Sequence, residues 1–525
     1  MRTTADHISV WPAARSPSTS RRLRDLLPNH SSPPERFEVV HLTAECWPFA
    51  RTGGLGEAVA GLAASQAAAG IGVIVVMPLY RAVRASVPHL QPVGTPFRVP
   101  VGTHDEEVQL FRAAHMTGSP RVFFIAHPFS FDRDGIYGEA GADYPDNARR
   151  FALFSRAAIR ALSRIAPHPR VVQAHDWHSA LALAELRFRD RFDHSSPRPL
   201  AVLSVHNAGF QGSFPPENTS DLLPDVWRRA TELRSSRGVN FLEIGLAYCD
   251  LAVTVSPNHA RELRTREGGF GLHETFAALG TRLVGIANGI DAERWDPARD
   301  TALPVQFSGA SLAGKAACKT ALQQSCGLEE RADVPLFAMC TRLAQQKGLD
   351  LVLDANLPAQ RDAQFVFVGR GEPRYERALA ELAAAAPGRV ALRLDFSDEL
   401  EHRLLAGADA LLMPSFYEPC GLTQMRAQRY GTIPVARSVG GLVDSIDDDV
   451  TGFLFGDYTR EAFLAAIWRA RERYADAARW REMMQRAMRR DFGWGRASDT
   501  YIALYRRSLS GATSRRAPAS LGAEV

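Results

Sequence analysis

Short apolar segments alternate with longer helical patterns along most of the chain, and this alternation constrains the fold more than any other feature. Several segments are apolar on both faces, which is typical of parallel strands that helices cover on both sides. Alternating strands and helices predict an open parallel α/β sheet. In the first half the predicted strands are residues 37–43, 72–77, 122–126, 171–174, 201–205, 252–255 and 284–287, with helical patterns such as 55–69 and 147–163 between them.

A second series of strands follows a stretch punctuated by Pro and Gly, at residues 336–340, 365–368, 390–394, 410–413 and 433–436. The two series predict an α/β protein with two Rossmann-like domains. Because ligands of such sheets bind beyond the carboxyl ends of the strands, two facing domains predict one interdomain cleft. We predict a disordered extension (1–35), an N-terminal, acceptor-side and catalytic domain (36–290), a linker region (291–333), a C-terminal nucleotide-sugar-binding domain (334–511) and a tail (512–525).

Composition excludes several classes of protein. The 525 residues are 46% hydrophobic and 23% charged, which are ordinary values for a globular chain. The net charge is only +4, with no basic domain or stripe, so neither nucleic acid nor a membrane surface is an expected partner. No stretch is long and apolar enough for a membrane span. Six cysteines without a CxxC pair predict neither a zinc site nor a disulfide framework, and the expected location is cytoplasmic.

The basic residues are divided very unequally between arginine and lysine. Of the 62 basic residues only Lys315, Lys319 and Lys347 are lysines, which leaves 59 arginines. A coding bias toward arginine accounts for most of this ratio. A position that nevertheless keeps lysine is a candidate for chemistry that needs a compact ammonium group.

Polar and glycine-rich groups follow the predicted strands of the first half. Gly53 and Gly54 lie in a turn that opens a helix, where backbone N–H groups favour an anion, although a turn without a ligand explains them equally well. His175-Asp176-Trp177-His178 ends the fourth strand, and His206-Asn207 ends the fifth. The HxxH spacing suggests a metal, but it crosses a strand end and no carboxylate pair completes the ligands. We therefore expect no metal.

In the second half, two cations flank the start of a predicted helix. Arg342 and Lys347 are five residues apart, an arrangement that suits a diphosphate. Glu418 lies between a strand and a helix, where a carboxylate can accept hydrogen bonds from sugar hydroxyls while the amides after it face a phosphate. The alternative for Glu418 is a carboxylate that only complements the helix dipole.

With these motifs in this order, the chain resembles the bacterial glycogen synthases and plant starch synthases. This family consists of retaining glucosyltransferases with two Rossmann-like domains, the GT-B architecture. The motifs are Arg-Thr-Gly-Gly-Leu-Gly (51–56), Asp-Tyr-Pro-Asp-Asn (143–147), His-Asp-Trp-His (175–178), His-Asn (206–207), Thr-Val-Ser-Pro (254–257), Asn-Gly-Ile-Asp (288–291) with Trp295, Arg-Leu (342–343) with Gln-Lys-Gly-Leu-Asp (346–350), Glu-Pro-Cys-Gly-Leu-Thr-Gln (418–424), Tyr-Gly-Thr-Ile-Pro (430–434) and Gly-Gly-Leu (440–442).

The resemblance implies transfer of glucose from ADP-glucose to the nonreducing end of an α-1,4-glucan, either glycogen or a maltooligosaccharide, with retention of configuration and without a metal or other cofactor. It implies that Arg342 and Lys347 hold the diphosphate, that His206 and Asp176 hold the donor glucose, and that Glu418 binds its hydroxyls. The donor-binding set that it implies is completed by Arg51, Gly53, Gly54, Asn207, Gly421, Leu422 and Thr423.

Two positions depart from the pattern of the resemblance. The glycine-rich loop of the family usually begins with Lys, and here Arg51 stands in its place. Many related transferases carry a second Glu where this chain has Arg426, although glycogen and starch synthases commonly lack it too. The alternatives are a related transferase that uses UDP-glucose or a short oligosaccharide acceptor, and a catalytically silent glucan-binding protein. A phosphorylase would need a lysine for pyridoxal phosphate, and the chain is short for that class.

Overall fold

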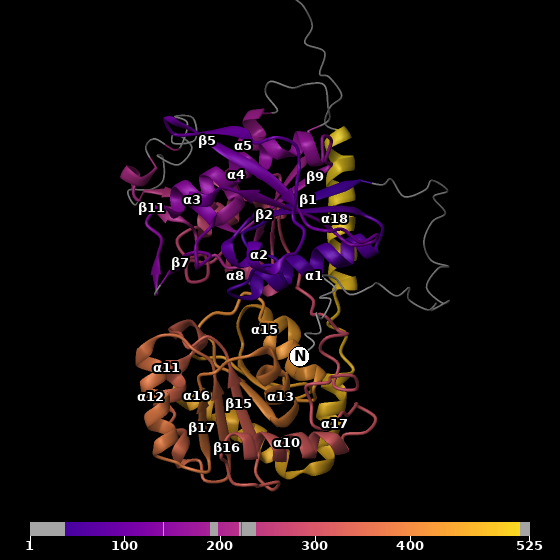
Figure 1. Cartoon of the computed structure of the whole chain (residues 1–525). Coiled ribbons are helices and arrows are strands. Elements are labelled where there is room, and N and C mark those ends of the chain that lie inside the picture. Colours follow the sequence, from indigo (N-terminus) through magenta and orange to yellow (C-terminus); the bar gives the residue numbers. More distant parts are fainter. Residues whose placement is uncertain (1–36, 140, 190–197, 220–221, 223–237, 515–525) are drawn as a thin grey trace, which may run out of the picture. The chain divides into compact units, whose positions relative to one another are not determined.

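The computed structural model describes residues 37–139, 141–189, 198–219, 222 and 238–514, and the predicted extension at 1–35 lies outside them. The chain forms two compact units (Figure 1). Of the described residues, unit 1 contains those between 37 and 253, then 274–284 and 495–514, whereas unit 2 contains 254–273 and 285–494.

Unit 1 is built on a ten-stranded sheet whose central strands are parallel. Its order is β14-β13-β10-β9-β1-β2-β6-β5-β3, with β4 paired to β5. The strands are β1 (Glu38–Leu42), β2 (Gly72–Pro78), β3 (Gln91–Pro92), β4 (Phe97–Val101), β5 (His104–Arg112), β6 (Arg121–Ala126), β9 (Val171–His175), β10 (Leu200–Val205), β13 (Leu251–Thr254) and β14 (Leu283–Gly285). The seven predicted strands of this half are all present.

Sequence analysis missed the antiparallel edge formed by β3, β4 and β5. The longest of these strands, β5, reads His-Asp-Glu-Glu-Val-Gln-Leu-Phe-Arg and buries only Val108 and Leu110 fully. A strand with so few buried positions lacks the continuous apolar run by which the central strands were recognised. Two small antiparallel sheets, β7 (Gly138–Glu139) with β8 (Ala142–Asp143) and β11 (Ser213–Phe214) with β12 (Val239–Asn240), were also missed, because strands of two residues are too short to form an apolar run.

Unit 2 is built on a six-stranded sheet in which every neighbouring pair is parallel. Its order is β17-β16-β15-β18-β19-β20, which is the Rossmann order 3-2-1-4-5-6. The strands are β15 (Leu336–Cys340), β16 (Gln364–Val368), β17 (Val390–Arg393), β18 (Ala410–Met413), β19 (Ile433–Arg437) and β20 (Phe453–Phe455). Only the three-residue β20 was not predicted, and the first six parallel strands of unit 1 follow the same order. The α/β prediction of two Rossmann-like domains is therefore confirmed.

Helices connect the strands of both sheets. They are α1 (Gly54–Ala68), α2 (Arg81–Ser86), α3 (Pro128–Phe131), α4 (Asn147–Ile165), α5 (Trp177–Arg189), α7 (Phe241–Tyr248), α8 (Pro257–Glu262), α9 (His273–Ala278), α10 (Ala313–Ser325), α11 (Leu349–Asp354), α12 (Pro373–Ala384), α13 (Asp398–Gly407), α14 (Thr423–Arg429), α15 (Gly440–Ser445), α16 (Arg460–Ala475), α17 (Ala477–Met488) and α18 (Trp494–Ser514). Among the helices in the described ranges, none combines the length and the apolarity that crossing a bilayer requires.

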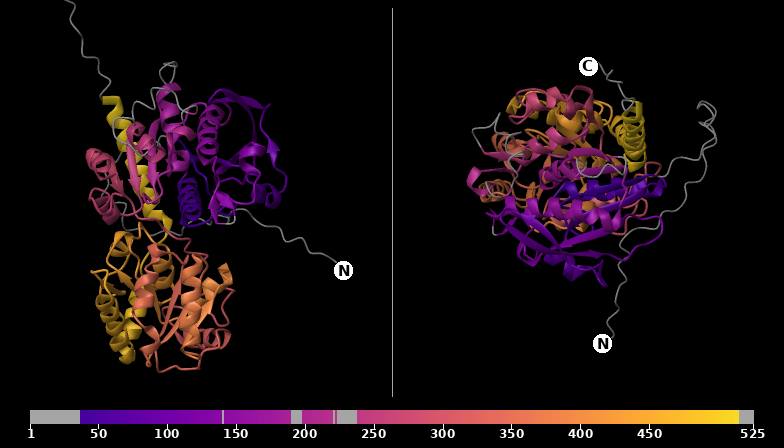
Figure 2. Two further views of the ribbon diagram at one scale, coloured as in Figure 1. Left: turned by 90° about the vertical axis from the view of Figure 1, so that its left-hand side faces the viewer. Right: turned by 90° about the horizontal axis from the view of Figure 1, so that it is seen from above.

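The structure differs from the predicted domain boundaries at three places. Residues 254–273 and 285–290, which were predicted to lie in the N-terminal domain, belong to unit 2. The predicted linker, 291–333, is folded into unit 2, where Trp295 and Phe307 are buried and α10 packs on α13. The last helix, α18, belongs to unit 1 and buries Tyr505 there; it is the yellow helix in Figures 1 and 2. The chain thus returns to its first unit after completing the second, which a reading in chain order does not anticipate. The helix also runs to Ser514, three residues into the predicted tail.

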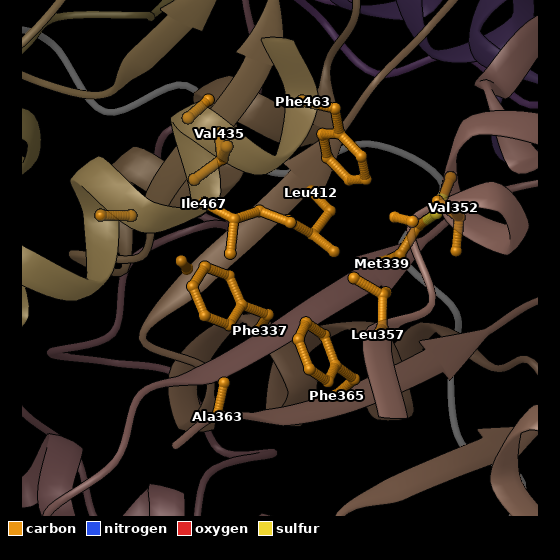
Figure 3. Close-up of a cluster of buried hydrophobic side chains, with 14 of the residues drawn as sticks. Phe337, Met339, Val352, Leu357, Ala363, Phe365, Leu412, Val435, Phe463 and Ile467 are labelled. Carbon is orange, nitrogen blue, oxygen red and sulfur yellow. The ribbon is translucent and has the colours of Figure 1, made fainter. Parts of the chain in front are cut away.

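One large cluster in the core of unit 2 consists of aromatic and aliphatic side chains packed against one face of its sheet (Figure 3). Phe337 of β15 and Phe365 of β16 stack with their ring centroids 5.4 Å apart, and Phe463 and Ile467 of α16 belong to the same cluster. Because interiors are close-packed, a cavity in this cluster removes both apolar burial and contacts.

We expect Phe365→Ala to lower the free energy of unfolding of unit 2 by about 3–5 kcal/mol, because the ring is 1% exposed and its neighbours cannot fill the space. Chemical denaturation monitored by circular dichroism measures the change. The matched control is Phe396→Ala, since Phe396 is 47% exposed and should change stability by less than about 0.5 kcal/mol. Equal losses in the two variants would contradict the assignment of this core.

Candidate active site

In each unit the predicted site residues follow strands that meet where the strand order reverses. This switch point lies between β1 and β9 in unit 1 and between β15 and β18 in unit 2. Sheets of this type bind their ligands beyond the carboxyl ends of the strands at such a point. Four candidate residues occupy this position: Asp176 follows β9, Arg342 and Lys347 follow β15, and Glu418 follows β18. His206 follows β10, the strand next to β9.

In unit 2 the structure brings Lys347 and Glu418 together. The Lys347 Nζ atom donates to Glu418 Oε2 at 2.6 Å, and Ser415 Oγ donates to the same oxygen at 3.1 Å. The carboxylate side chain is only 7% exposed, whereas the lysine side chain remains 21% exposed. A short, mostly buried ion pair with one accessible cation is suited to receiving a second anion.

Backbone geometry keeps the loops that carry these two residues in contact. Phe416 N donates to Gln346 O at 2.8 Å, which ties the loop after β18 to the turn that contains Lys347. Gly348 has φ +77°, and a Cβ atom there would lie 1.9 Å from Pro414 O. Only glycine is compatible with this approach, so the Lys-Gly pair is a structural requirement for placing the lysine.

Arg342 is exposed on the loop that follows β15. Its Nη2 atom lies 3.5 Å from Oε1 of Gln346, the residue beside Lys347. The structure therefore places the predicted cation on the same loop as Lys347.

The loop that contains Gly421, Leu422 and Thr423 leads directly into α14. The side chain of Gln424 holds this loop in place, because its Nε2 atom donates to Cys420 O and Gly421 O, both at 3.0 Å. The predicted amide donors thus lie on an ordered turn after Glu418.

In unit 1 the glycine-rich turn is organised by a carboxylate that sequence analysis missed. Glu45 accepts hydrogen bonds from Thr52 N at 2.7 Å, Gly53 N at 3.4 Å and the Tyr137 hydroxyl at 2.6 Å. The predicted donor-binding residue Arg51 forms an ion pair with Glu57 at 2.6 Å. Glu45 follows β1 by three residues, so the rule that polar residues gather at strand ends could have identified it.

Asp176, His206 and Asn207 form a second cluster in unit 1. Asp176 has φ +55°, and its Oδ1 atom accepts His206 N at 2.7 Å and Asn207 N at 3.4 Å. Burial raises the pKa of Asp176 to about 7. The carboxyl group therefore orders the loop that carries His206.

The HxxH pair does not converge on one point. His175 Nδ1 lies 2.9 Å from His206 Nε2, whereas the ring of His178 stacks on Tyr137 with centroids 4.6 Å apart. Within the described residues, no group of three or more His, Cys, Asp or Glu side chains could hold a metal ion.

Arg426, at the position of the departure from related transferases, is part of the interior of unit 2. Its Nη1 atom pairs with Glu401 at 2.8 Å, and its guanidinium group lies 4.4 Å above the Trp295 ring. Trp295 in turn stacks on His402 with centroids 3.9 Å apart. The arginine is only 6% exposed, so this position has a packing role in this protein.

The other two lysines support the fold rather than the site. Lys315 Nζ caps the end of α13 by donating to Ala406 O at 3.0 Å and Ala408 O at 2.9 Å, and burial lowers its pKa to about 8. Lys319 Nζ pairs with Asp409 Oδ2 at 2.8 Å. Each lysine thus places a compact ammonium in a narrow polar setting, which a planar guanidinium would not fit.

Comparisons with known proteins show the family of the chain. Residues 38–278 match the model of the starch synthase catalytic domain, and residues 325–486 match that of the group 1 glycosyl transferases. A glycogen synthase from Anaeromyxobacter dehalogenans (strain 2CP-C) is 42% identical, over 90% of this chain and 99% of the relative. One from Myxococcus xanthus is 40% identical, over 89% and 99%. The chain belongs to the glycogen and starch synthase family.

Solved structures extend the agreement to three dimensions. The catalytic domain of Starch Synthase IV from Arabidopsis thaliana, bound to ADP and acarbose, matches with a TM-score of 0.81 and 33% identity, over 90% of this chain and all of that one. A sucrose-phosphate synthase from Thermosynechococcus elongatus matches with a TM-score of 0.59 at 18% identity, which shows a shared fold. The protein is therefore a GT-B glycosyltransferase, as its resemblance to the family predicted.

The buried histidines of this glycosyltransferase predict acid sensitivity. Burial lowers the pKa of His41 and His206 to about 4 and that of His178 to about 3, from an ordinary value of 6.5. The unfolded chain therefore takes up protons below pH 6.5 that the folded chain does not, and the stability of unit 1 should fall as the pH falls from 6.5 toward 4. Calorimetry between pH 7 and 5 measures this dependence.

Asp176→Asn is the matched variant for that measurement. Because the folded pKa of Asp176 is raised, its contribution to stability grows as the pH falls and partly offsets the loss from the histidines. The asparagine removes this offset and keeps an oxygen that can accept from His206 N, so its stability should fall more steeply with acid. A stability that stays level down to pH 5 would contradict the assigned pKa directions.

Proposed function

We propose that this protein is a glycogen synthase that transfers glucose from ADP-glucose to the nonreducing end of an α-1,4-glucan with retention of configuration. The observation that carries the proposal is the Lys347–Glu418 pair at the switch point of unit 2. Relatives named glycogen synthases, about 40% identical over nine-tenths of the chain, support the reaction. The similar starch synthase structure bound to ADP and acarbose supports an adenine nucleotide and a glucan as substrates.

In this proposal the cations of unit 2 bind the diphosphate of the donor. When the donor binds, the Lys347 ammonium group turns from Glu418 toward the diphosphate. Arg342 contacts the diphosphate from the same exposed loop. Both cations then stabilise the charge that develops as ADP leaves. Because the ammonium group then contacts Glu418 less closely, the Glu418 carboxylate can accept hydrogen bonds from the glucose hydroxyls. The amides of residues 421–423 complete the diphosphate site.

Unit 1 supplies the groups near the transferred glucose. His206 and Asn207 face the sugar. The backbone amides of both residues donate to the Asp176 carboxyl group, which holds their loop in place. Arg51 and the amides of Gly53 and Gly54 contact the donor from the turn that Glu45 organises. No carboxylate is assigned as a covalent nucleophile. The glucan therefore attacks on the face from which ADP departs, and the diphosphate takes up the proton of the attacking hydroxyl.

The reaction as proposed needs no metal or other cofactor. Two fixed cations neutralise the leaving diphosphate, which is the task that a divalent ion performs in many phosphate sites. We also propose that the protein acts in the cytoplasm, where its six free cysteines would stay reduced.

A direct assay tests the proposal. The protein is incubated with glycogen and either ADP-glucose or UDP-glucose in the presence of a chelator, and release of the nucleoside diphosphate is measured. Release from ADP-glucose, with equal growth of the glucan, is the expected result. Release from UDP-glucose alone would replace the donor in the proposal, and release from neither donor would overturn it.

Lys347→Arg tests the need for a compact ammonium group. The change keeps the charge, but a guanidinium is too large for the 2.6 Å contact that Ser415 also shares. Turnover should drop at least about tenfold, or roughly 1.4 kcal/mol of transition-state stabilisation. The matched control is Arg331→Lys at an exposed ion pair of the same unit, which should leave turnover unchanged. If turnover of Lys347→Arg equals that of the wild type, the proposed catalytic role of the lysine is wrong.

Arg51→Lys restores the residue that the family usually has in the glycine-rich loop. Arg51 is held by Glu57, and a lysine there would present a smaller cation to the donor. We expect the ratio of kcat/KM for ADP-glucose to that for UDP-glucose to change in this variant. A ratio identical to that of the wild type would mean that position 51 does not contribute to donor choice.

A further inference from the structure

A line of buried hydrogen bonds begins at His206 and passes through two further histidines of unit 1. His206 Nε2 lies 2.9 Å from His175 Nδ1, and His175 Nε2 lies 3.0 Å from His41 Nδ1. His41 and His175 lie on the adjacent parallel strands β1 and β9, and His206 follows β10, the next strand along. Both His41 and His175 are fully buried, although neither belongs to the site proposed above.

The line continues away from the site through side-chain amides. His41 Nε2 lies 2.9 Å from Oε1 of Gln66 in α1, and Gln66 Nε2 donates to the hydroxyl of Tyr505 in α18 at 3.3 Å. The Tyr505 hydroxyl donates to Gln173 Oε1, and Gln173 Nε2 donates to Ser204 Oγ at 2.6 Å. All of these side chains lie within unit 1.

The orientation of Gln66 determines the tautomer of every ring in the line. An amide oxygen only accepts, so His41 must donate from Nε2. A neutral imidazole has one N–H, so His41 Nδ1 accepts, and His175 must donate from Nε2. The same step makes His206 donate from Nε2. Burial lowers the pKa of all three rings, which keeps them neutral at ordinary pH.

We propose that His41 and His175, held by Gln66 and Tyr505, are positioning residues that fix His206 as its Nε2–H tautomer. In this tautomer Nδ1 carries the lone pair and accepts a hydrogen bond from a hydroxyl of the donor sugar. The part about the sugar rests on the proposed function, whereas the tautomer is a property of the protein alone. Reversing His206 by itself would set two lone pairs against each other at its contact with His175, and one buried hydrogen bond would be lost.

Long-range proton–nitrogen NMR of protein labelled with ¹⁵N-histidine reads the tautomers directly. The wild-type protein without substrate should show protonated Nε2 and unprotonated Nδ1 for His41, His175 and His206. Replacing each histidine in turn assigns its signals. A His206 that is protonated on Nδ1, or that averages between its two tautomers, would overturn the proposal.

Tyr505→Phe tests whether the far end of the line acts on His206. The change removes the hydroxyl that orients Gln66, so the signals of His206 should shift toward a mixture of tautomers. The kcat for ADP-glucose should fall roughly tenfold, the factor that the loss of about one hydrogen bond produces. The KM for the donor should stay within a factor of about two, because the change acts on orientation rather than on contacts.

Tyr474→Phe is the matched control. The Tyr474 hydroxyl also makes two hydrogen bonds, since it accepts from Lys319 Nζ and donates to Ala332 O, but it lies in unit 2. It should leave the histidine signals and kcat unchanged. Histidine signals that are the same in Tyr505→Phe as in the wild type would refute the positioning role. A protein with the expected tautomers that releases no ADP would instead refute only the proposed function.

Discussion

The adjacency of the first and fourth parallel strands in each sheet is the constraint on which the placement of the candidate residues depends. A parallel sheet directs the carboxyl ends of all its strands to one edge, and the reversal of strand order leaves a gap in the covering loops at that edge. Loops that are 71 residues apart in sequence therefore meet, as Lys347 and Glu418 do. In unit 1 the residues after β9 lie at the corresponding point, and the residues after β10, the next parallel strand, lie beside them.

Burial determines how the charged and polar groups at these edges behave. Glu418 is almost fully buried and is kept in place by a cation and a hydroxyl, so its charge is already compensated before any ligand arrives. In unit 1, burial instead lowers the pKa of the histidines, so that they are uncharged at neutral pH, and it raises the pKa of Asp176 to about 7. The candidate residues after β15 and β18 thus present charges, which suit a diphosphate, whereas the histidines of unit 1 present neutral hydrogen-bonding groups, which suit a sugar.

Sequence analysis could find the strands that bury both faces and the residues that follow them, because both leave a local signal. It identified β15 and β18 closely and hence placed Arg342 and Glu418 correctly relative to their strands. It could not find features that depend on long-range packing, because nothing local links Tyr505 to a strand 332 residues away. Glu45, by contrast, follows β1 by three residues and was within reach of the same local rule, although sequence analysis did not single it out. Sequence analysis missed the return of α18 to unit 1 because that return also depends on long-range packing.

The scarcity of lysine has a practical consequence for chemistry on this protein. Lys315 and Lys319 are 5% and 6% exposed and are bonded to several partners each, whereas the Lys347 side chain is 21% exposed. An amine-selective acylating reagent therefore meets one accessible lysine side chain in the whole sequence, and that lysine lies at the candidate site. Apart from the terminal amine, the protein therefore has a single attachment site for a fluorophore or cross-linker. A label at this lysine would report whether a ligand occupies the candidate site.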